Sequence, residues 1–289
     1  MALILVTGAA GKTGMALCQA LLARHAPVRA FVRRPSQVPI MQALGIDDVV
    51  VGDMRVQADV GRAVHGVQAI VHICSNMNPD EIPIGHLFIA AARRKKVERF
   101  VYYSVLHPQT EDMPHHWNKL RVEEALFQTE LQYTILQPAS YMQNILPGWK
   151  LIVEEGIYRV PYTLETRLGL VDLDDVALAT AIVLTEPGHA GATYELATDE
   201  VLSQTQIADI LGRGLGRPVQ AEVLPLEAWE RQARTSGLGD YQVEALLKMF
   251  RYYERYGLWG SANVLRWLLR REPTRFATFV QRMLNHTSV

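Results

Sequence analysis

The segment PHHWNK, residues 114–119, carries two histidines and a lysine within little more than one helical turn. Pro114 suits the first turn of a helix. A helix that starts there places four residues on one stripe: His115, Lys119, Val122 and Leu126. Because the last two are apolar, we expect this stripe to face the protein interior. His116 and Trp117 are expected to point elsewhere, toward solvent or a neighbouring lobe.

An inward lysine and histidine could take part in catalysis. Lys119 could hold a sugar hydroxyl and place a positive charge beside a reacting atom; the alternative is an exposed lysine paired with Glu123. His115 has a reference pKa of about 6.5, which suits a general acid, but the nearby lysine disfavours its protonated form. A structural histidine is therefore an equally good interpretation.

Two further side chains are candidates for contact with a substrate. Ser104 follows a strand pattern and could hydrogen-bond a substrate oxygen, although a serine at a strand end is also common in ordinary loops. Tyr141 follows the turn at Pro138 and could act as an acid or as a face for a substrate ring, or could simply pack in the core.

The glycine-rich segment VTGAAGKTG, from Val6 to Gly14, follows the first apolar run and opens the first helical pattern. Its spacing lets the backbone turn tightly, approach a pyrophosphate and pack the helix against the strand, with the phosphates at the helix N-terminus. The pattern predicts a dinucleotide site. The loop residues assigned to it are Gly8, Ala10, Gly11, Lys12 and Thr13.

The charges near this loop favour NADP(H) over NAD(H). An NAD site usually offers an acidic residue about twenty positions on, to bind the ribose 2′-hydroxyl, but no Asp or Glu precedes Asp47. The second strand pattern, VRAFV, instead runs into Arg33 and Arg34. With Lys12 these cations fit a 2′-phosphate; the alternative is that the arginines are merely solvated.

Asp53 and Met54 are predicted to meet the adenine, Asp53 through a hydrogen bond and Met54 through packing. A simple turn is the alternative at this position, since Gly52 comes directly before them.

The elements that must position these residues alternate between strands and helices. Short apolar runs predict strands at 3–6, 28–32, 48–51, 69–73, 99–103, 133–136 and 194–196. Helical patterns lie at 13–24, 57–65, 81–95, 115–128 and 174–185. Such alternation predicts an α/β fold with a doubly wound parallel sheet, whose ligands bind outside the carboxyl ends of the strands. Residues after those strand ends complete the predicted coenzyme contacts: Cys74, Ser75, Pro138 and Ser140, with Lys119.

The chain is expected to divide into a coenzyme-binding Rossmann core, 1–147, and a mixed region, 148–289. The mixed region returns one strand and one helix, at about 170–197, to the core. Its remaining helical patterns, at 203–216, 226–236 and within 240–285, predict a helical substrate-binding lobe. An aromatic run in that lobe fits either a core or a substrate cage: Tyr252, Tyr253, Tyr256 and Trp259.

Composition argues against several other classes of protein. A net charge of −1 with 20% charged residues offers no general attraction to nucleic acid or to an anionic membrane. Cys18 and Cys74 cannot form a disulfide framework, and neither a secretory leader nor a membrane span is visible, so a cytoplasmic location is expected. No metal site is predicted, because His107, His115, His116 and Cys74 lack a recognised ligand spacing. The oligomeric state stays open.

Several segments resemble the NmrA-like family of atypical short-chain dehydrogenases/reductases: RFVYYSV (99–105), PHHWNKLRVEEAL (114–126), YTILQPASYMQN (133–144), VDLDDVALATAIVLTEPGHAGATYEL (171–196) and NVLRWLLRREPTRFATFV (263–280). The resemblance implies a Rossmann fold that usually binds NADP, with a helical lobe over the nicotinamide end. In the related Tyr-x-x-x-Lys motif the tyrosine exchanges the proton and the lysine holds the nicotinamide ribose. Here His115 stands where that tyrosine would be, as in many NmrA-like sequences.

Two functions are compatible with these features. The first, which we favour slightly, is an NADPH-dependent reductase that passes hydride to a small apolar or aromatic acceptor, such as a quinone, enone or carbonyl. The second is a non-catalytic NADP(H) redox sensor that regulates a protein partner, which the missing tyrosine would suit.

Overall fold

The computed structural model describes residues 2–75 and 77–287, which form two compact units. The first unit runs to Gln137 and includes Val176–Tyr194, and the second contains Pro138–Asp175 and the chain from Glu195 onward. The first unit therefore ends before the domain boundary expected after residue 147.

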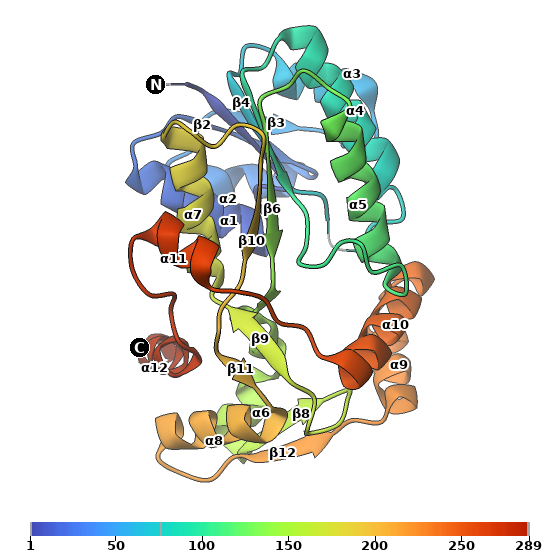
Figure 1. Cartoon of the computed structure of the whole chain (residues 1–289), viewed down its shortest axis with the longest axis vertical. Coiled ribbons are helices and arrows are strands. Elements are labelled where there is room, and N and C mark those ends of the chain that lie inside the picture. The colour runs from blue at the N-terminus through green and yellow to red at the C-terminus, as the bar shows by residue number, and fades with distance from the viewer. Residues whose placement is uncertain (1, 76, 288–289) are drawn as a thin grey trace. The chain divides into compact units, whose positions relative to one another are not determined.

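A seven-stranded sheet forms the centre of the fold (Figure 1). Its strand order is β10-β6-β5-β4-β1-β2-β3. The seven predicted strands are confirmed, with these bounds: β1 Ile4–Thr7, β2 Val28–Val32, β3 Val49–Val51, β4 Ala69–His72, β5 Arg99–Tyr103, β6 Tyr133–Pro138 and β10 Ala192–Leu196. Each pair from β3 through β6 is parallel. The carboxyl ends of these strands therefore lie along one edge of the sheet, where side-chain chemistry is expected.

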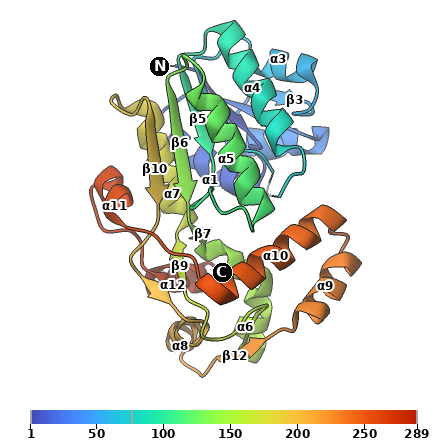
Figure 2. The same ribbon diagram turned by 45° about the vertical axis from the view of Figure 1, so that its right-hand side comes forward.

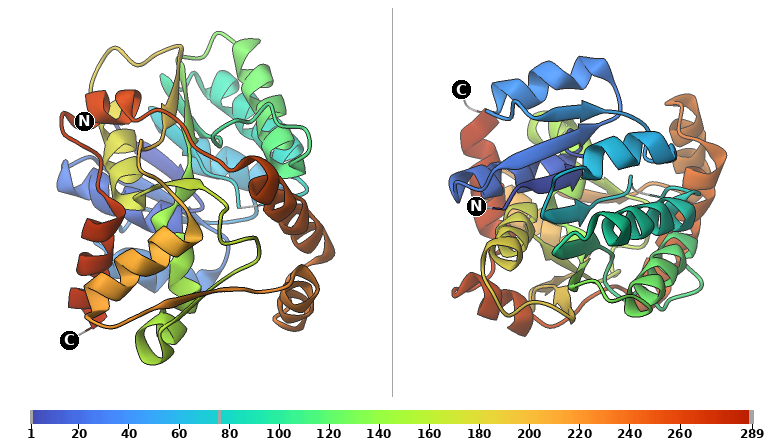
Figure 3. Two further views of the ribbon diagram at one scale, coloured as in Figure 1. Left: turned by 60° about the horizontal axis from the view of Figure 1, so that its bottom comes forward. Right: turned by 90° about the horizontal axis from the view of Figure 1, so that it is seen from above.

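Helices cover both faces of this sheet. The helices α1 (Lys12–Ala23) and α7 (Leu173–Thr185) lie on one face, and α3 (Gln57–Val64), α4 (Glu81–Lys95) and α5 (Pro114–Phe127) lie on the other (Figures 1 and 3). Arg24, just after α1, donates hydrogen bonds to Thr185 and Glu186 at the end of α7. With a helical layer on each face, the strands can be apolar on both sides, and β1 and β4 are fully buried.

The connection from β2 to β3 contains a short segment that the sequence patterns did not predict. A 3₁₀ turn, η1 (Pro35–Gln37), leads into α2 (Val38–Ala43). Six residues give too few apolar repeats for a helical period to be recognised.

The second unit contains more strands than its sequence predicted. A three-stranded sheet joins β7 (Ser140–Tyr141), β9 (Leu168–Val171) and β11 (Val201–Leu202), and β8 (Ile157–Val160) pairs with β12 (Gln220–Val223). The predicted helices are present as α8 Gln204–Leu215, α9 Leu226–Thr235, α10 Asp240–Tyr256, α11 Asn263–Leu269 and α12 Phe276–Thr287. The 3₁₀ segment η2 (Met142–Gly148) and α6 (Trp149–Glu155) were not predicted. Figure 2 shows β9 beside β7.

An ion pair holds the last helix within the second unit. Arg282 of α12 lies 2.8 Å from an oxygen of Asp172, a residue with no exposed surface. Gln143 donates to the other oxygen of the same carboxylate at 2.7 Å. No helix among the described residues is long and apolar enough to cross a membrane.

Candidate active site

The glycine loop adopts a backbone that needs its glycines. Gly8 has φ +60°, a conformation that other residues rarely adopt. A Cβ on Gly14 would lie 2.3 Å from the Gly8 carbonyl oxygen, so a side chain there would push α1 away from the loop. The Ala9 amide donates to the Phe31 carbonyl at 3.3 Å, which ties the loop to the end of β2.

This loop fits the pyrophosphate of a dinucleotide. Gly11 is the N-cap of α1, and the first turn of this helix contains no acidic residue, so its amides and dipole face no competing anion there. Lys12 and Thr13 are the first two residues of the helix, and Ala10 comes directly before the cap. Partial burial lowers the pKa of Lys12 below its usual value.

The two arginines predicted to bind a 2′-phosphate lie at the same sheet edge. Arg33 and Arg34 follow β2 directly, and both are exposed. Their backbone amides donate to the side-chain oxygen of Gln37, which shapes the turn, and the charge of Arg33 helps to lower the pKa of Asp53. A solvent-accessible guanidinium can pair with a phosphate dianion in a bidentate manner.

Asp53 and Met54 follow β3 as predicted, but the carboxylate of Asp53 is already paired. It accepts hydrogen bonds from Arg55 at 2.9, 3.0 and 2.6 Å, and these bonds lower its pKa to about 2. Met54 packs against the core of the first unit. The adenine contacts predicted for both residues stay predictions, and a contact from Asp53 would add to its pairing with Arg55.

Lys119 points inward from α5, as the helical stripe predicted. His115 and Lys119 are buried, and Val122 and Leu126 have no exposed surface. The ammonium donates to Glu81 at 3.1 Å and to the carbonyl oxygen of Tyr103, the last residue of β5, at 2.9 Å. The alternative of an exposed lysine paired with Glu123 is wrong, because the pairing partner is Glu81 and only 9% of Lys119 is exposed.

Glu123 instead forms a second buried cluster with Ser104, the residue after β5. The hydroxyl of Ser104 donates to Glu123, and the side-chain amide of Gln137 donates to both carboxylate oxygens at 2.9 and 3.0 Å. Burial raises the pKa of Glu123, and these hydrogen bonds oppose that rise. Since Ser104 directs its proton to Glu123, it offers lone pairs to another group. Its predicted contact with a substrate oxygen would require that proton to turn away.

The histidines beside Lys119 are neutral at physiological pH. Burial is the main cause that lowers the pKa of His115 to about 3 and that of His116 to about 4, and the charge of Lys119 contributes to both shifts. The two rings pack edge to face with centroids 4.5 Å apart. Of the two directions expected for His116, toward solvent or toward the lobe, the first is wrong, since the residue is 1% exposed; its ring contacts the His107 carbonyl at 3.2 Å.

His115 is therefore poorly suited to be a charged general acid. Its buried Nδ1 has no hydrogen-bond partner among the described residues. A ring with a pKa of about 3 carries almost no second proton at neutral pH. Its catalytic role stays a prediction, and the neutral ring fits hydrogen bonding or packing better than proton donation.

The segment after β4 brings Cys74 and Ser75 to the same edge. Thr7, at the end of β1, accepts from the Ile73 amide at 2.8 Å and donates to the Ile73 carbonyl at 3.0 Å. Asn78 donates to the Ser75 hydroxyl at 3.0 Å and contacts the sulfur of Cys74 at 3.5 Å. Burial raises the pKa of Cys74 to about 12, so it is a thiol and not a nucleophilic thiolate.

The remaining predicted contacts belong to the second unit. Pro138 ends β6, and Ser140 and Tyr141 form β7, which pairs in parallel with β9. Asn144 donates to the Ser140 hydroxyl at 3.2 Å. Their roles toward a coenzyme or substrate stay predictions.

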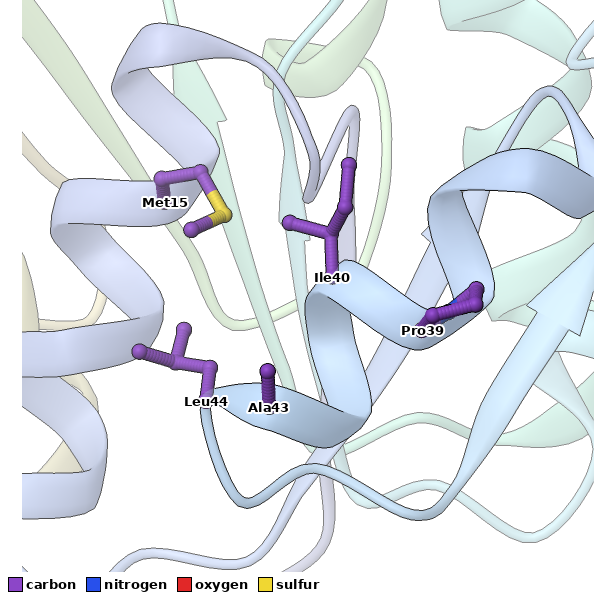
Figure 4. Close-up of a pocket in the computed structure, with 5 residues that line it drawn as sticks. All are labelled: Met15, Pro39, Ile40, Ala43 and Leu44. Atoms are coloured by element: carbon purple, nitrogen blue, oxygen red, sulfur yellow. The ribbon is translucent and has the colours of Figure 1, made fainter.

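An apolar depression also lies in the first unit, between α1 and α2 (Figure 4). It has a volume of about 500 Å³ and is lined by Met15, Pro39, Ile40, Ala43 and Leu44. None of these side chains can donate or accept a proton, so the depression adds nothing to the polar groups of the candidate site. No group of three or more potential metal ligands occurs among the residues that the structure describes.

Glu81 and Gln137 contribute to the site but were not predicted from the sequence. Glu81 starts a predicted helix after a predicted strand, which places a carboxylate near the ligand edge. Its partner Lys119 is 38 positions further along the chain, and no local pattern indicates that pairing. Gln137 lies within β6, where a single polar residue gave no signal.

The profile of the NmrA-like family matches residues 1–280. The chain belongs to the NmrA-like family. This membership and the parallel sheet confirm the resemblance seen in the sequence. They also confirm the expected fold class.

Relatives of this chain match it from end to end. Quinone oxidoreductase 2 of Escherichia coli K12 is 26% identical over 285 residues, covering 98% of this chain and 99% of the relative. The NAD(P)H azoreductase of Xenophilus azovorans is 25% identical over 284 residues, covering 96% and 97%. Among solved structures, an NADPH-dependent quinone oxidoreductase from Escherichia coli in complex with NADPH has a TM-score of 0.84 at 27% identity, covering 98% of this chain and all of the other.

Proposed function

We propose that this protein is an NADPH-dependent reductase that transfers hydride to a small quinone-like acceptor. The observation that carries the proposal is that two different sets of side chains lie at the carboxyl ends of the strands in one sheet. A glycine loop followed by Arg33 and Arg34 lies at the ends of β1 and β2, and a buried lysine contacts the end of β5. The first arrangement suits a 2′-phosphorylated dinucleotide, and the second suits the ribose beside its reactive ring.

The relatives support the same function. Both full-length relatives described above are named as reductases or oxidoreductases that act on quinones or azo compounds, and a neighbour of known structure holds NADPH. Because the matches span nearly all of both chains, they include the coenzyme loop as well as the region that would receive the acceptor. These features favour turnover over the alternative of a non-catalytic redox sensor.

In this proposal the first-unit residues bind and orient the coenzyme. The amides at Gly11 and the start of α1 hold the pyrophosphate, Arg33 and Arg34 hold the 2′-phosphate, and Lys119 holds the nicotinamide ribose. The bound coenzyme supplies the hydride. Loss of one guanidinium contact to a phosphate typically costs about 1.5 to 3 kcal/mol, so the arginines should dominate the choice between NADPH and NADH.

The state of the buried side chains favours an acceptor that needs little help from a protein acid. His115 is neutral and Ser104 donates to Glu123, so neither has a proton ready for a substrate alkoxide. Reduction of a quinone gives a stabilised hydroquinone anion that water can protonate, whereas an unactivated carbonyl needs a stronger donor. Quinones therefore fit this site better than simple ketones.

Coenzyme choice and turnover can be tested together. Purified protein is titrated with NADPH and NADH, and NADPH oxidation is then followed with quinones, enones and simple ketones. We expect tighter binding of NADPH and turnover with quinones. Arg33→Ala should weaken NADPH binding about tenfold while changing NADH binding little. The matched control is Arg121→Ala, since Arg121 pairs with Glu124 on the exposed side of α5.

Two results would reject parts of this function. Stronger binding of NADH than of NADPH would remove the argument from the arginines. Tight NADPH binding without oxidation by any acceptor would favour the redox sensor.

A further inference from the structure

The ammonium of Lys119 is held by three groups of the first unit. Besides its contacts with Glu81 and the Tyr103 carbonyl, it lies 5.3 Å from the centre of the Tyr102 ring. A protonated lysine has three N–H donors, and the two hydrogen bonds use two of them. The geometry therefore fixes the direction of the ammonium more firmly than a flexible surface lysine allows.

Glu81 is well placed to be the counter-charge of this lysine. It is the first residue of α4, a helix of 15 residues, where the helix dipole favours an anion. Only 2% of Glu81 is exposed. The hydroxyl of Tyr102 donates to the same Oε1 atom that accepts from Lys119, at 2.7 Å. Glu81 is thus fixed by its helix and by a buried tyrosine, and it fixes the lysine in turn.

The surroundings of this pair offer Lys119 little other negative charge. The titratable groups that face the pair are His72 from β4, Cys74 after it, Tyr102 from β5, and His115, His116 and Glu123 from α5. The carboxylate of Glu123 is bound to Ser104 and Gln137. A buried ammonium without an ionic partner is strongly disfavoured, so Glu81 has a specific electrostatic role here.

We propose that Glu81 is a positioning residue that keeps Lys119 charged and directed toward the nicotinamide ribose of bound coenzyme. This inference rests on the proposed function, because it takes Lys119 as the lysine that contacts the coenzyme. Glu81 itself touches no coenzyme or substrate and acts only through Lys119.

A change of Glu81 to glutamine separates this role from a merely structural one. Glu81→Gln keeps the length of the side chain and an oxygen acceptor for Tyr102, but it removes the negative charge. Burial then favours loss of the Lys119 proton as the pH rises, and coenzyme binding should weaken in parallel. A structural defect would weaken binding equally at every pH.

The pH range from 7 to 9.5 isolates this effect. The pKa values of His72, His115 and His116 are lowered to about 4, 3 and 4, that of Cys74 is raised to about 12, and that of Tyr102 lies well above 10. Glu123, whose pKa is also raised, and Lys12 of the glycine loop, whose pKa is lowered by burial, are present in every protein compared, so their titration cancels when each variant is compared with the wild type. Above pH 7 the 2′-phosphate of NADPH is mostly dianionic, since its second pKa is about 6.

The experiment measures the NADPH dissociation constant by fluorescence titration across this range. The proteins are the wild type, Glu81→Gln, Lys119→Met and the double variant, with circular dichroism to verify folding. From pH 7 to 9.5 we expect NADPH binding by Glu81→Gln to weaken about tenfold more than binding by the wild type, in which only the shared titration of Lys12 contributes. Lys119→Met should bind weakly at every pH, and the double variant should equal it, because Glu81 acts only through the lysine.

Glu130→Gln is the matched control. Glu130 pairs with Arg93 of α4 at 3.1 Å, and its side chain is 70% exposed. Loss of this ion pair should leave the NADPH dissociation constant at the wild-type value throughout the range. Glu81→Asp, which keeps the charge, should restore the pH profile of the wild type.

Different outcomes overturn different claims. A pH-independent defect in Glu81→Gln, or an additional loss in the double variant beyond that of Lys119→Met, would overturn the role of Glu81 alone. Failure of the wild type to bind NADPH would overturn the proposed function and this inference with it. If Glu81→Gln does not fold, Tyr102→Phe replaces it: binding should weaken about threefold in the wild-type background and not in Lys119→Met, and equal weakening in both would overturn the inference.

Discussion

At the scale of single residues, burial determines whether the histidines of this protein carry a charge. His72 has no exposed surface and stacks on Phe88 with ring centroids 4.5 Å apart, and burial lowers its pKa to about 4. His115 and His116 are lowered in the same way. These rings favour the neutral form when folded, whereas in the unfolded chain they take up a proton near pH 6.5. Folding therefore opposes protonation.

This difference predicts a loss of stability in mild acid. Below about pH 6.5 the unfolded state binds more protons than the folded state, so the stability contributed by neutral histidine falls as the pH falls toward the folded pKa. For His115, with a folded pKa of about 3, the loss between pH 7 and pH 5 is about 2 kcal/mol. Between pH 7 and pH 5, His115→Asn should therefore lose about 2 kcal/mol less of its free energy of unfolding than the wild type does, as measured by urea unfolding at each pH.

The exposed His86 of α4 supplies the control for this prediction. His86→Asn should unfold with the same pH dependence as the wild type. An identical loss of stability in wild type and His115→Asn would contradict a neutral, buried His115.

The sequence predicted the direction of Lys119 but not its partner. A helical period of apolar residues shows which side of α5 faces inward, and Lys119 shares that side. Pairing with Glu81 depends on how α4 packs beside α5, which is a tertiary property. For the same reason the only partner that the sequence offered, as an alternative, was Glu123, the charge one turn away, while the folded chain directs Glu123 to Ser104 and Gln137.

At the scale of elements, the junction of β1 and α1 is the most constrained part of the coenzyme site. Gly14→Ala would place a Cβ 2.3 Å from the Gly8 oxygen and 2.6 Å from the Ala9 Cα, and both are backbone atoms. The helix must shift to relieve this contact, and the amides at its N-terminus move with it. We expect at least tenfold weaker NADPH binding, roughly 1.4 kcal/mol or more, together with a lower melting temperature.

A glycine in a neighbouring helix gives the matched control. Gly61 lies within α3, and an added Cβ there would meet no atom within 4 Å. Gly61→Ala should stabilise the protein by about 0.5 to 1 kcal/mol, because alanine favours the helix, and should leave NADPH binding unchanged. Normal coenzyme binding by Gly14→Ala would contradict the role assigned to this junction.

Elements with strong periodic patterns were predicted, and short ones were not. Most strands of the central sheet are largely buried, and β1 to β5 are each followed by a helix, so their patterns were clear. The strand β7 has two residues, and β12 (QAEV) contains polar residues and is largely exposed. Such strands form through pairing within the second unit and carry no apolar period of their own.

At the scale of the whole molecule, the chain combines a clear coenzyme site with an overall charge near neutral. Its net charge of −1 provides no long-range field, so the cations near the glycine loop act locally on a bound phosphate. Bound coenzyme should stabilise the fold. At a concentration one hundred times the dissociation constant, NADPH would add about 2.7 kcal/mol to the stability of whichever part binds it.

The two functions considered from the sequence differ in one property of the entire protein, namely whether the coenzyme is consumed. A redox sensor binds NADPH and releases it unchanged, whereas a reductase oxidises it once an acceptor arrives. The matches to reductases span nearly the whole chain, and the neutral histidines and the Ser104–Glu123 hydrogen bond point to acceptors that need little acid assistance.

A single-turnover measurement tests this claim most directly. A limiting amount of NADPH is first bound by excess protein, and the complex is then mixed with a quinone in a stopped-flow instrument, while the fluorescence of bound NADPH is followed. The account predicts loss of the NADPH signal at a rate that rises with quinone concentration and falls at least about tenfold in Lys119→Met. A persistent NADPH signal in the wild type, with binding intact, would contradict it.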